Sequence, residues 1–148
     1  MKKLVLILIG FIPFVIGLQM NTWLMENQDR VLPFEIIGIV FLIFWILVGF
    51  ITSKFEKTPL KTAIIINLPA FLVLLLIMYQ SIILGHTWPN LFGLATQMYF
   101  LPLVNISSKI IGILFFYVHI WSASLLAFLL MFVASYFGSY LRRRLVKS

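Results

Sequence analysis

The spacing of the charged residues constrains this chain more than any other feature. They divide it into four long uncharged stretches, residues 4–25, 36–53, 62–108 and 110–141. A helix that crosses a membrane needs roughly 17–25 mostly apolar residues, so each stretch is long enough to hold one. The sequence therefore predicts an all-α membrane protein.

The composition supports the same class. Of the 148 residues, 63% are hydrophobic and 10% are charged, whereas soluble domains carry about 25% charged residues. Cysteine is absent, which excludes disulfides, Cys-ligated metals and thiol nucleophiles. The chain also lacks nucleotide-binding and zinc-protease motifs, and its charged segments are too short for a soluble catalytic domain. We expect one integral membrane domain, residues 1–148, with no catalytic residues, cofactor or metal.

The third uncharged stretch is too long for one crossing, because as a single helix it would measure about 70 Å. The sequence Gly85–Asn90 contains Gly, Pro and Asn, which end helices. We therefore predict a four-helix bundle in which an interfacial or re-entrant segment, residues 90–101, separates the last two helices. The predicted transmembrane helices span residues 3–22, 34–53, 60–84 and 107–141.

The cations indicate the orientation. Nine of the eleven lie before the first helix, between the second and third, or after the fourth. Cytoplasmic segments of membrane proteins are enriched in Lys and Arg. We therefore expect a multi-pass protein of the plasma membrane with both termini in the cytoplasm, and we interpret the N-terminal run as an uncleaved first helix. The clustering of cations at helix ends argues for this topology and against a nucleic-acid partner.

Two prolines fall inside predicted helices. Pro13 and Pro69 each remove a backbone donor, which leaves a carbonyl unpaired and favours a kink. We expect a kink at each position.

Small residues form a stripe on the predicted fourth helix. Helices associate in lipid mainly through such residues, because apolar side chains gain little by leaving lipid for a neighbouring helix. The stripe is expected either to pack the chain's own bundle or to form an interface with a partner or a second copy. Its residues are Gly112, Ala123, Ala127, Ala134 and Gly138.

Four polar residues are candidates for a site within the membrane, where such groups are costly and often functional. His119 lies about 15 Å beyond Lys109 along a continuous helix, so we place it near the midplane, as a proton carrier, a ligand-binding group or a buried structural imidazole. Asn67 is expected to bond backbone freed by the Pro69 kink. Glu35 and Lys109 end their helices on the side away from the termini, where they either pair or reach separately into water.

Two further features bear on ligands. His86, the only other histidine, is expected at a different depth from His119, which argues against a haem with two histidine ligands. Arg142, Arg143 and Arg144 are expected to attract anionic lipid headgroups.

Three functions remain open at this level. The first is an accessory, regulatory or immunity-type subunit that contacts a larger membrane protein through its helices. The second is a small oligomeric transporter, channel or ligand-binding bundle with a polar midplane site. An enzyme acting on lipids would depend on His119 alone. Membrane lipids are the expected partners in every case.

Overall fold

The computed structural model describes residues 2–115 and 117–147, and every regular element in these ranges is helical. A 3₁₀ turn at Ser53–Phe55 follows the third helix, and a π-helical turn at Tyr79–Leu84 follows the fifth. The α-helices are α1 (Lys2–Ile9), α2 (Ile12–Glu26), α3 (Phe34–Thr52), α4 (Pro59–Ile66), α5 (Leu68–Met78), α6 (Leu91–Tyr99), α7 (Leu101–Leu114) and α8 (Ile120–Lys147).

Several of these helices are long and apolar enough to cross a membrane, which makes this a multi-pass membrane protein. Three stretches qualify alone: Lys2–Glu26, Phe34–Phe55 and Ile120–Val146. Two bent pairs of helices bring the number to as many as five. In the first pair, α4 and the helical stretch that ends at Leu84 meet at a bend of 51°. In the second pair, α6 and α7 meet at a bend of 66°.

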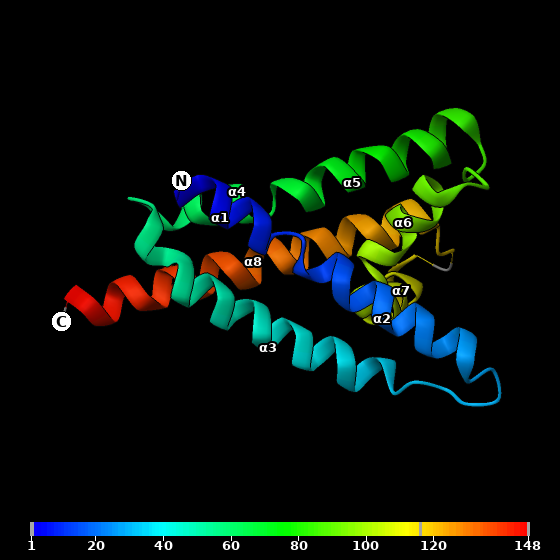
Figure 1. Cartoon of the computed structure of the whole chain (residues 1–148), viewed down its shortest axis with the longest axis horizontal. Coiled ribbons are helices and arrows are strands. Elements are labelled where there is room, and N and C mark those ends of the chain that lie inside the picture. Colours follow the sequence, from blue (N-terminus) through cyan, green and yellow to red (C-terminus); the bar gives the residue numbers. More distant parts are fainter. Residues whose placement is uncertain (1, 116, 148) are drawn as a thin grey trace.

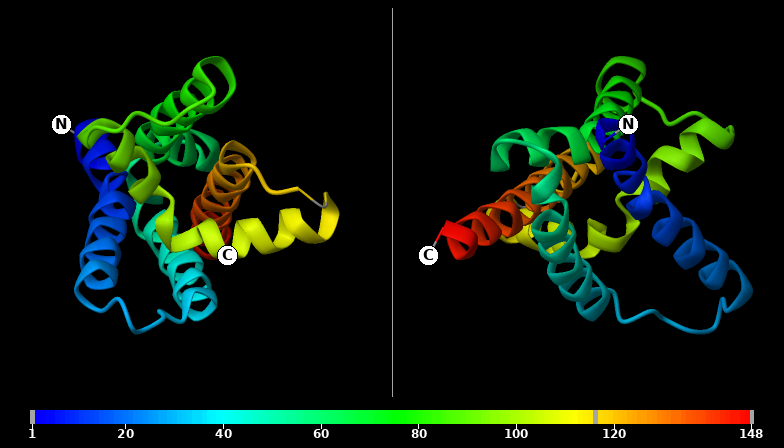
Figure 2. Two further views of the ribbon diagram at one scale, coloured as in Figure 1. Left: turned by 90° about the vertical axis from the view of Figure 1, so that its right-hand side faces the viewer. Right: turned by 60° about the vertical axis from the view of Figure 1, so that its left-hand side comes forward.

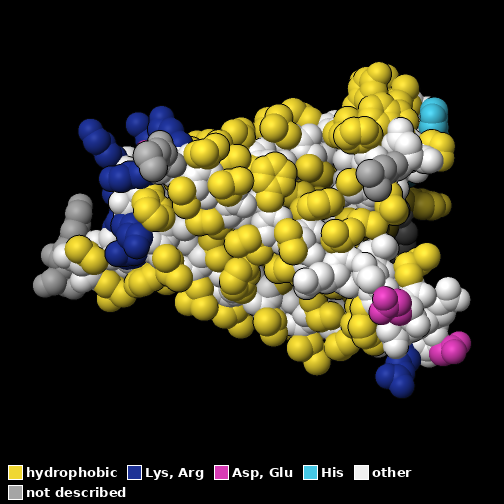
Figure 3. All heavy atoms as spheres, viewed as in Figure 1, with side chains coloured by type: hydrophobic (Ala, Val, Ile, Leu, Met, Phe, Trp, Pro, Cys, Tyr) yellow, Lys and Arg dark blue, Asp and Glu magenta, His cyan; other side chains and the backbone are white. Residues whose placement is uncertain are grey.

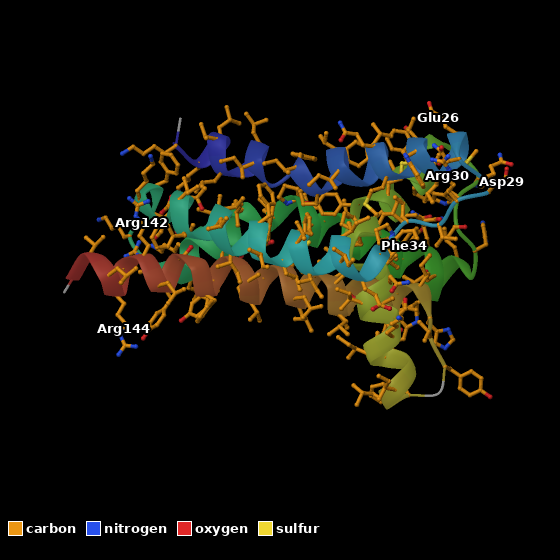
Figure 4. All side chains as sticks on the ribbon, turned by 90° about the horizontal axis from the view of Figure 1, so that it is seen from below. Glu26, Asp29, Arg30, Phe34, Arg142 and Arg144 are labelled. Atoms are coloured by element: carbon orange, nitrogen blue, oxygen red, sulfur yellow. The ribbon has the colours of Figure 1, made fainter. Side chains whose placement is uncertain are left out.

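The long helices run side by side along one axis (Figure 1). The pair α1–α2, helix α3, the α4–α5 pair and helix α8 all follow the length of the molecule, whereas α6 and α7 occupy one half of it. Helix α7 lies across this axis and projects sideways from the bundle, as Figure 2 and Figure 4 show from different sides. Helix α7 therefore differs in direction from the long helices.

The two ends of the molecule differ in charge. Basic side chains gather at one end, and the acidic side chains visible in Figure 3 lie at the other. We call the first the basic end: α1 begins there, the α3–α4 connection lies there, and α8 ends there with Arg142 and Arg144 (Figures 1 and 4). The opposite end carries Glu26, Asp29 and Arg30 (Figure 4). Large apolar side chains cover much of the surface between them, as expected of a surface that faces lipid.

Small residues bring α3 and α8 into direct backbone contact. A Cβ atom added to Gly138 would overlap the carbonyl of Ile46, and one added to Gly49 would overlap that of Ser135. Two hydroxyl groups tie the same helices together: Ser139 donates to the Gly49 carbonyl at 2.8 Å and Ser53 to the Ser139 carbonyl at 3.1 Å. Close approach combined with hydrogen bonds is the usual way in which helices associate in lipid.

The helices break beside both prolines, with a bend of 51° at the Pro69 break, and the broken helices pack against each other. The chain breaks between α1 and α2, where Phe14 donates to Phe11 instead of to Gly10. The hydroxyl of Tyr99, at the α6–α7 break, donates to the Gly10 carbonyl. A Cβ at Gly10 would overlap the Ile66 carbonyl beside the Pro69 kink, so three helix breaks meet inside the bundle.

The expected helix over 107–141 is not continuous. Helix α7 ends at Leu114, and α8 begins at Ile120. The physical reason lies upstream: Pro102 bends the chain between α6 and α7 by 66°, which sends α7 out of the bundle. The chain must then turn before α8 can follow the bundle axis.

Candidate functional site

An apolar cleft opens between α7 and the first turns of α8. Its volume is about 810 Å³, within the range of about 300–1,000 Å³ that is usual for small-molecule sites. Large side chains dominate its walls, and Ser122 and His119 add polar groups on the α8 side. The cleft is lined by Ile111, Leu114, Phe115, Tyr117, His119, Trp121, Ser122, Leu125, Leu126 and Leu129.

The cleft exists because α7 points away from α8. Helix α7 is amphipathic: Asn105, Ser108 and Lys109 share one face, whereas Ile110 and Leu114 lie on the opposite side of the helix. Lys109 forms an ion pair with Glu35 in the first turn of α3. This contact joins α7 to α3, on the side of the bundle away from the cleft lining.

A second, more polar pocket adjoins the cleft at the end opposite the basic end. It measures about 520 Å³ and shares His119 and Trp121 with the cleft. Its other lining residues are Ser81, Ile82, Gly85, His86, Thr87 and Ile120. The apolar cleft and the polar pocket therefore meet at one shared wall.

Local structure positions the imidazole of His119 at this wall. Ser122 accepts from the His119 amide at 3.2 Å and donates to its carbonyl at 2.8 Å, which caps the start of α8. The His119 ring stacks on Trp121, with 6.2 Å between centroids and 12° between planes. Its side chain is exposed.

His86 reaches the same pocket from the end of α5. Gly85 adopts a left-handed conformation with φ of 69°, which ends the π-helical turn and reverses the chain. Nδ1 of His86 lies 2.9 Å from the Leu84 carbonyl oxygen. Because a carbonyl only accepts, Nδ1 is the donor in this contact.

The pocket also contains an unpaired hydroxyl. Ser81 Oγ is buried and has no hydrogen-bond partner among residues 2–115 and 117–147. A buried hydroxyl without a partner costs free energy. The described residues contain no group of three or more His, Asp or Glu side chains that could hold a metal ion.

The structure does not bring the four predicted polar residues together. His119 lies exposed immediately before α8 and not midway along a continuous helix, because the expected helix is interrupted at Phe115. Glu35 and Lys109 form an ion pair, and their side chains are 61% and 59% exposed. Asn67 is buried elsewhere, so the described residues form no joint site of these four.

Asn67 instead joins three helices. Its Oδ1 accepts from the Trp45 indole of α3 at 3.2 Å, and its Nδ2 donates to Ser135 of α8 at 2.7 Å. Nδ2 also donates to the Ala63 carbonyl in α4 at 2.8 Å. This side chain therefore stabilises the bundle at the α4–α5 kink.

The predicted stripe of small residues divides between two helices. Ala123, Ala127, Ala134 and Gly138 are buried on α8 inside the chain's own bundle. Gly112 lies apart from them, exposed on α7. The buried part of the stripe is therefore covered by this chain itself.

The three arginines also differ from one another. Arg142 donates to the carbonyls of Phe50 and Ile51, at 3.3 and 3.0 Å. Arg143 donates to the Ser53, Glu56 and Lys57 carbonyls. Both therefore fix the end of α3 and the connection to α4, whereas Arg144 is exposed and points away from the bundle (Figure 4).

Several residues at the cleft and pocket were not identified from sequence. The histidines were assigned different depths, so nothing suggested that His86 and His119 share a pocket. The sequence does contain one signal for the bend between α6 and α7. Pro102 lies one turn before an amphipathic segment, and a proline in this position indicates a bend between two short helices.

The comparisons with protein-family models, curated proteins and solved structures found no match for this chain.

Proposed function

We propose that the chain crosses the membrane four times, that α6 enters and leaves from one side, and that α7 lies along the interface on that side. The amphipathic sequence of α7 and its direction across the bundle support this topology (Figure 4). The cations at the basic end favour a cytoplasmic location for both termini and the plasma membrane as the location of the protein.

Within this topology the protein binds one lipid-like amphiphile from the leaflet that holds α7. Its hydrocarbon chain occupies the apolar cleft, and its polar end occupies the adjoining pocket beside His86 and His119. The observation that carries this proposal is the shared wall of His119 and Trp121, where an apolar cavity meets a polar one. An amphiphile has the same two-part chemistry.

A lipid chain fits the cleft better than a helix of a larger membrane protein does. Helix docking in lipid relies on small residues that permit close approach, and the small residues of α8 are covered by the chain itself. The cleft is lined mainly by Ile, Leu, Phe, Tyr and Trp side chains, and Ser122 is the one small residue in its lining. Binding of a partner subunit, as an accessory protein would require, is the competing outcome of the test.

The test compares lipids that remain bound after purification. Leu125→Trp fills the cleft, because Leu125 lines its α8 wall. Val133→Trp is the matched control, since Val133 is on the same helix, 61% exposed and outside the lining set. Mass spectrometry of the purified proteins under native conditions is expected to detect about one bound lipid in the wild type and Val133→Trp, and several-fold less in Leu125→Trp.

A photoactivatable fatty-acyl lipid in nanodiscs gives a second measurement. We expect its cross-links to concentrate on Leu114, Leu125 and Leu129, and to fall in Leu125→Trp. Equal lipid binding by all three proteins would contradict the proposal. So would a co-purifying membrane protein that Leu125→Trp alone releases, because that result would assign the cleft to a partner helix.

A further inference from the structure

A small pocket at the basic end is separate from the cleft. It measures about 280 Å³ and lies where the end of α3 meets the last turns of α8. Three basic residues, one serine and one apolar residue line it: Lys54, Arg142, Arg143, Ser53 and Val146.

The two arginines are held in place before any ligand binds. Arg143 uses Nε, Nη1 and Nη2 in bonds to Ser53 Oγ and to three carbonyls of the α3–α4 connection. Arg142 makes its two hydrogen bonds through Nη1 alone. A guanidinium has five N–H donors, so Nη2 and Nε of Arg142 remain available.

No carboxylate among residues 2–115 and 117–147 forms an ion pair with these cations. The ion pair formed within residues 2–115 and 117–147 is Lys109–Glu35, at the other end of the molecule. Arg142 and Arg143 are both partly buried, and their hydrogen-bond acceptors are neutral carbonyls and a hydroxyl. The Arg142 guanidinium also lies over the Phe50 ring, 5.8 Å from its centroid. Three cations around one pocket therefore present a positive potential without a counterion from the described chain.

We propose that this pocket binds the phosphate of an anionic phospholipid. Phosphate oxygens accept from the free donors of Arg142, whose planar fork suits a phosphate, and from the ammonium group of Lys54. Val146, 76% exposed beside the pocket, offers an apolar contact to the part of the lipid that follows the headgroup. Basic pockets between transmembrane helices bind anionic headgroups in this way.

The experiment uses the full chain in a neutral detergent and measures its thermal unfolding midpoint as phosphatidylglycerol or phosphatidylcholine is added. Lys54→Gln removes one cation from the pocket. Lys61→Gln removes the same charge outside the pocket, from a position on α4 that is also exposed. Arg142 and Arg143 are left unchanged because they support the α3–α4 connection.

We expect phosphatidylglycerol to raise the midpoint of the wild type and Lys61→Gln more than phosphatidylcholine does. The lipid concentration that gives half of the shift should rise about fivefold in Lys54→Gln, since one Lys near a membrane surface contributes about 1 kcal/mol. Sodium phosphate alone should leave the midpoint of all three proteins unchanged.

Three results would overturn the proposal. Equal shifts with the two lipids would remove the selectivity for anionic headgroups. Equal weakening by Lys54→Gln and Lys61→Gln would assign the effect to overall charge. A shift with sodium phosphate that matches the lipid shift and is lost in Lys54→Gln would assign the pocket to a soluble phosphate compound.

Discussion

Asn67 shows how one polar side chain can decide the packing of apolar helices. A buried amide can be tolerated in a membrane when its donors and acceptor are paired, and those of Asn67 are paired with α3, α4 and α8. The neighbouring Pro69 leaves the Ile65 carbonyl without its usual donor. The amide N–H of Asn67 lies close enough to bond both the Ala63 and Ile65 carbonyls.

Replacing this amide should weaken the bundle measurably. We expect Asn67→Leu to lower the free energy of unfolding by about 1–3 kcal/mol, because it leaves the buried Trp45 N–H without its acceptor. Unfolding by SDS in mixed micelles measures the change. Trp45→Phe is the companion variant: if the Trp45–Asn67 bond matters, the double variant will lose less than the sum of the single losses.

The position of His119 depends on a turn of the chain. Along a continuous helix His119 would lie about 15 Å beyond Lys109, but the chain turns between those residues. The sequence Phe115–Val118 contains no Gly or Pro to signal the turn. The location of this imidazole is therefore a consequence of where α7 points.

At the scale of elements, the α3–α8 pair holds the bundle together through backbone contact. Gly138 lies against the Ile46 carbonyl, and Ser139 and Ser53 add hydrogen bonds across the same contact. Close contact of this kind leaves no room for a larger side chain.

A matched pair of glycine substitutions tests this contact. Gly138→Ala should lower the free energy of unfolding by about 1–3 kcal/mol, since the new methyl group would overlap backbone of α3. Gly112→Ala should be neutral or stabilising by up to about 1 kcal/mol, because Gly112 is exposed and its Cβ would meet Val118 at 3.6 Å. The same SDS unfolding assay compares them, and equal losses would mean that the contact is not tight.

The element α7 depends on its neighbours for its direction. The Pro102 bend turns it, and the Glu35–Lys109 pair joins it to α3. An exposed ion pair contributes at most about 1 kcal/mol to the free energy of unfolding. The pair therefore affects the direction of α7 more than the stability of the fold. The cleft that we assign to a lipid exists only while α7 keeps this direction.

At the scale of the whole molecule, the charge asymmetry and the paths of the helices agree. Helix α1 begins and α8 ends at the basic end, and α6 and α7 stay in the opposite half (Figure 1). Segments rich in Lys and Arg remain on the cytoplasmic side because moving them across the membrane is disfavoured.

Labelling of introduced cysteines tests the topology, and the absence of native cysteine makes each label unambiguous. We expect Asp29→Cys and Tyr117→Cys to react with an impermeant maleimide from the extracellular side of intact cells. Lys57→Cys should react only after permeabilisation. If Tyr117→Cys behaves like Lys57→Cys, the α6–α7 segment crosses the membrane fully and the four-crossing topology is wrong.

The sequence by itself determined the features that depend on local chemistry. The class of protein follows from the free energy of placing apolar and charged side chains in lipid. The kinks at Pro13 and Pro69 follow from missing backbone donors, and the break at Gly85 follows from its left-handed conformation. Each of these effects acts within a few residues along the chain.

Only the tertiary structure decided the features that depend on which surfaces meet. It placed His86 and His119 in one pocket and buried the small residues of α8 inside the chain's own bundle. It also used the donors of Arg142 and Arg143 on carbonyls of a distant segment. These contacts join residues far apart in the sequence, and a small change in the direction of α7 changes the cleft. Local propensities do not contain that information, because the energy of such contacts arises only when the helices pack.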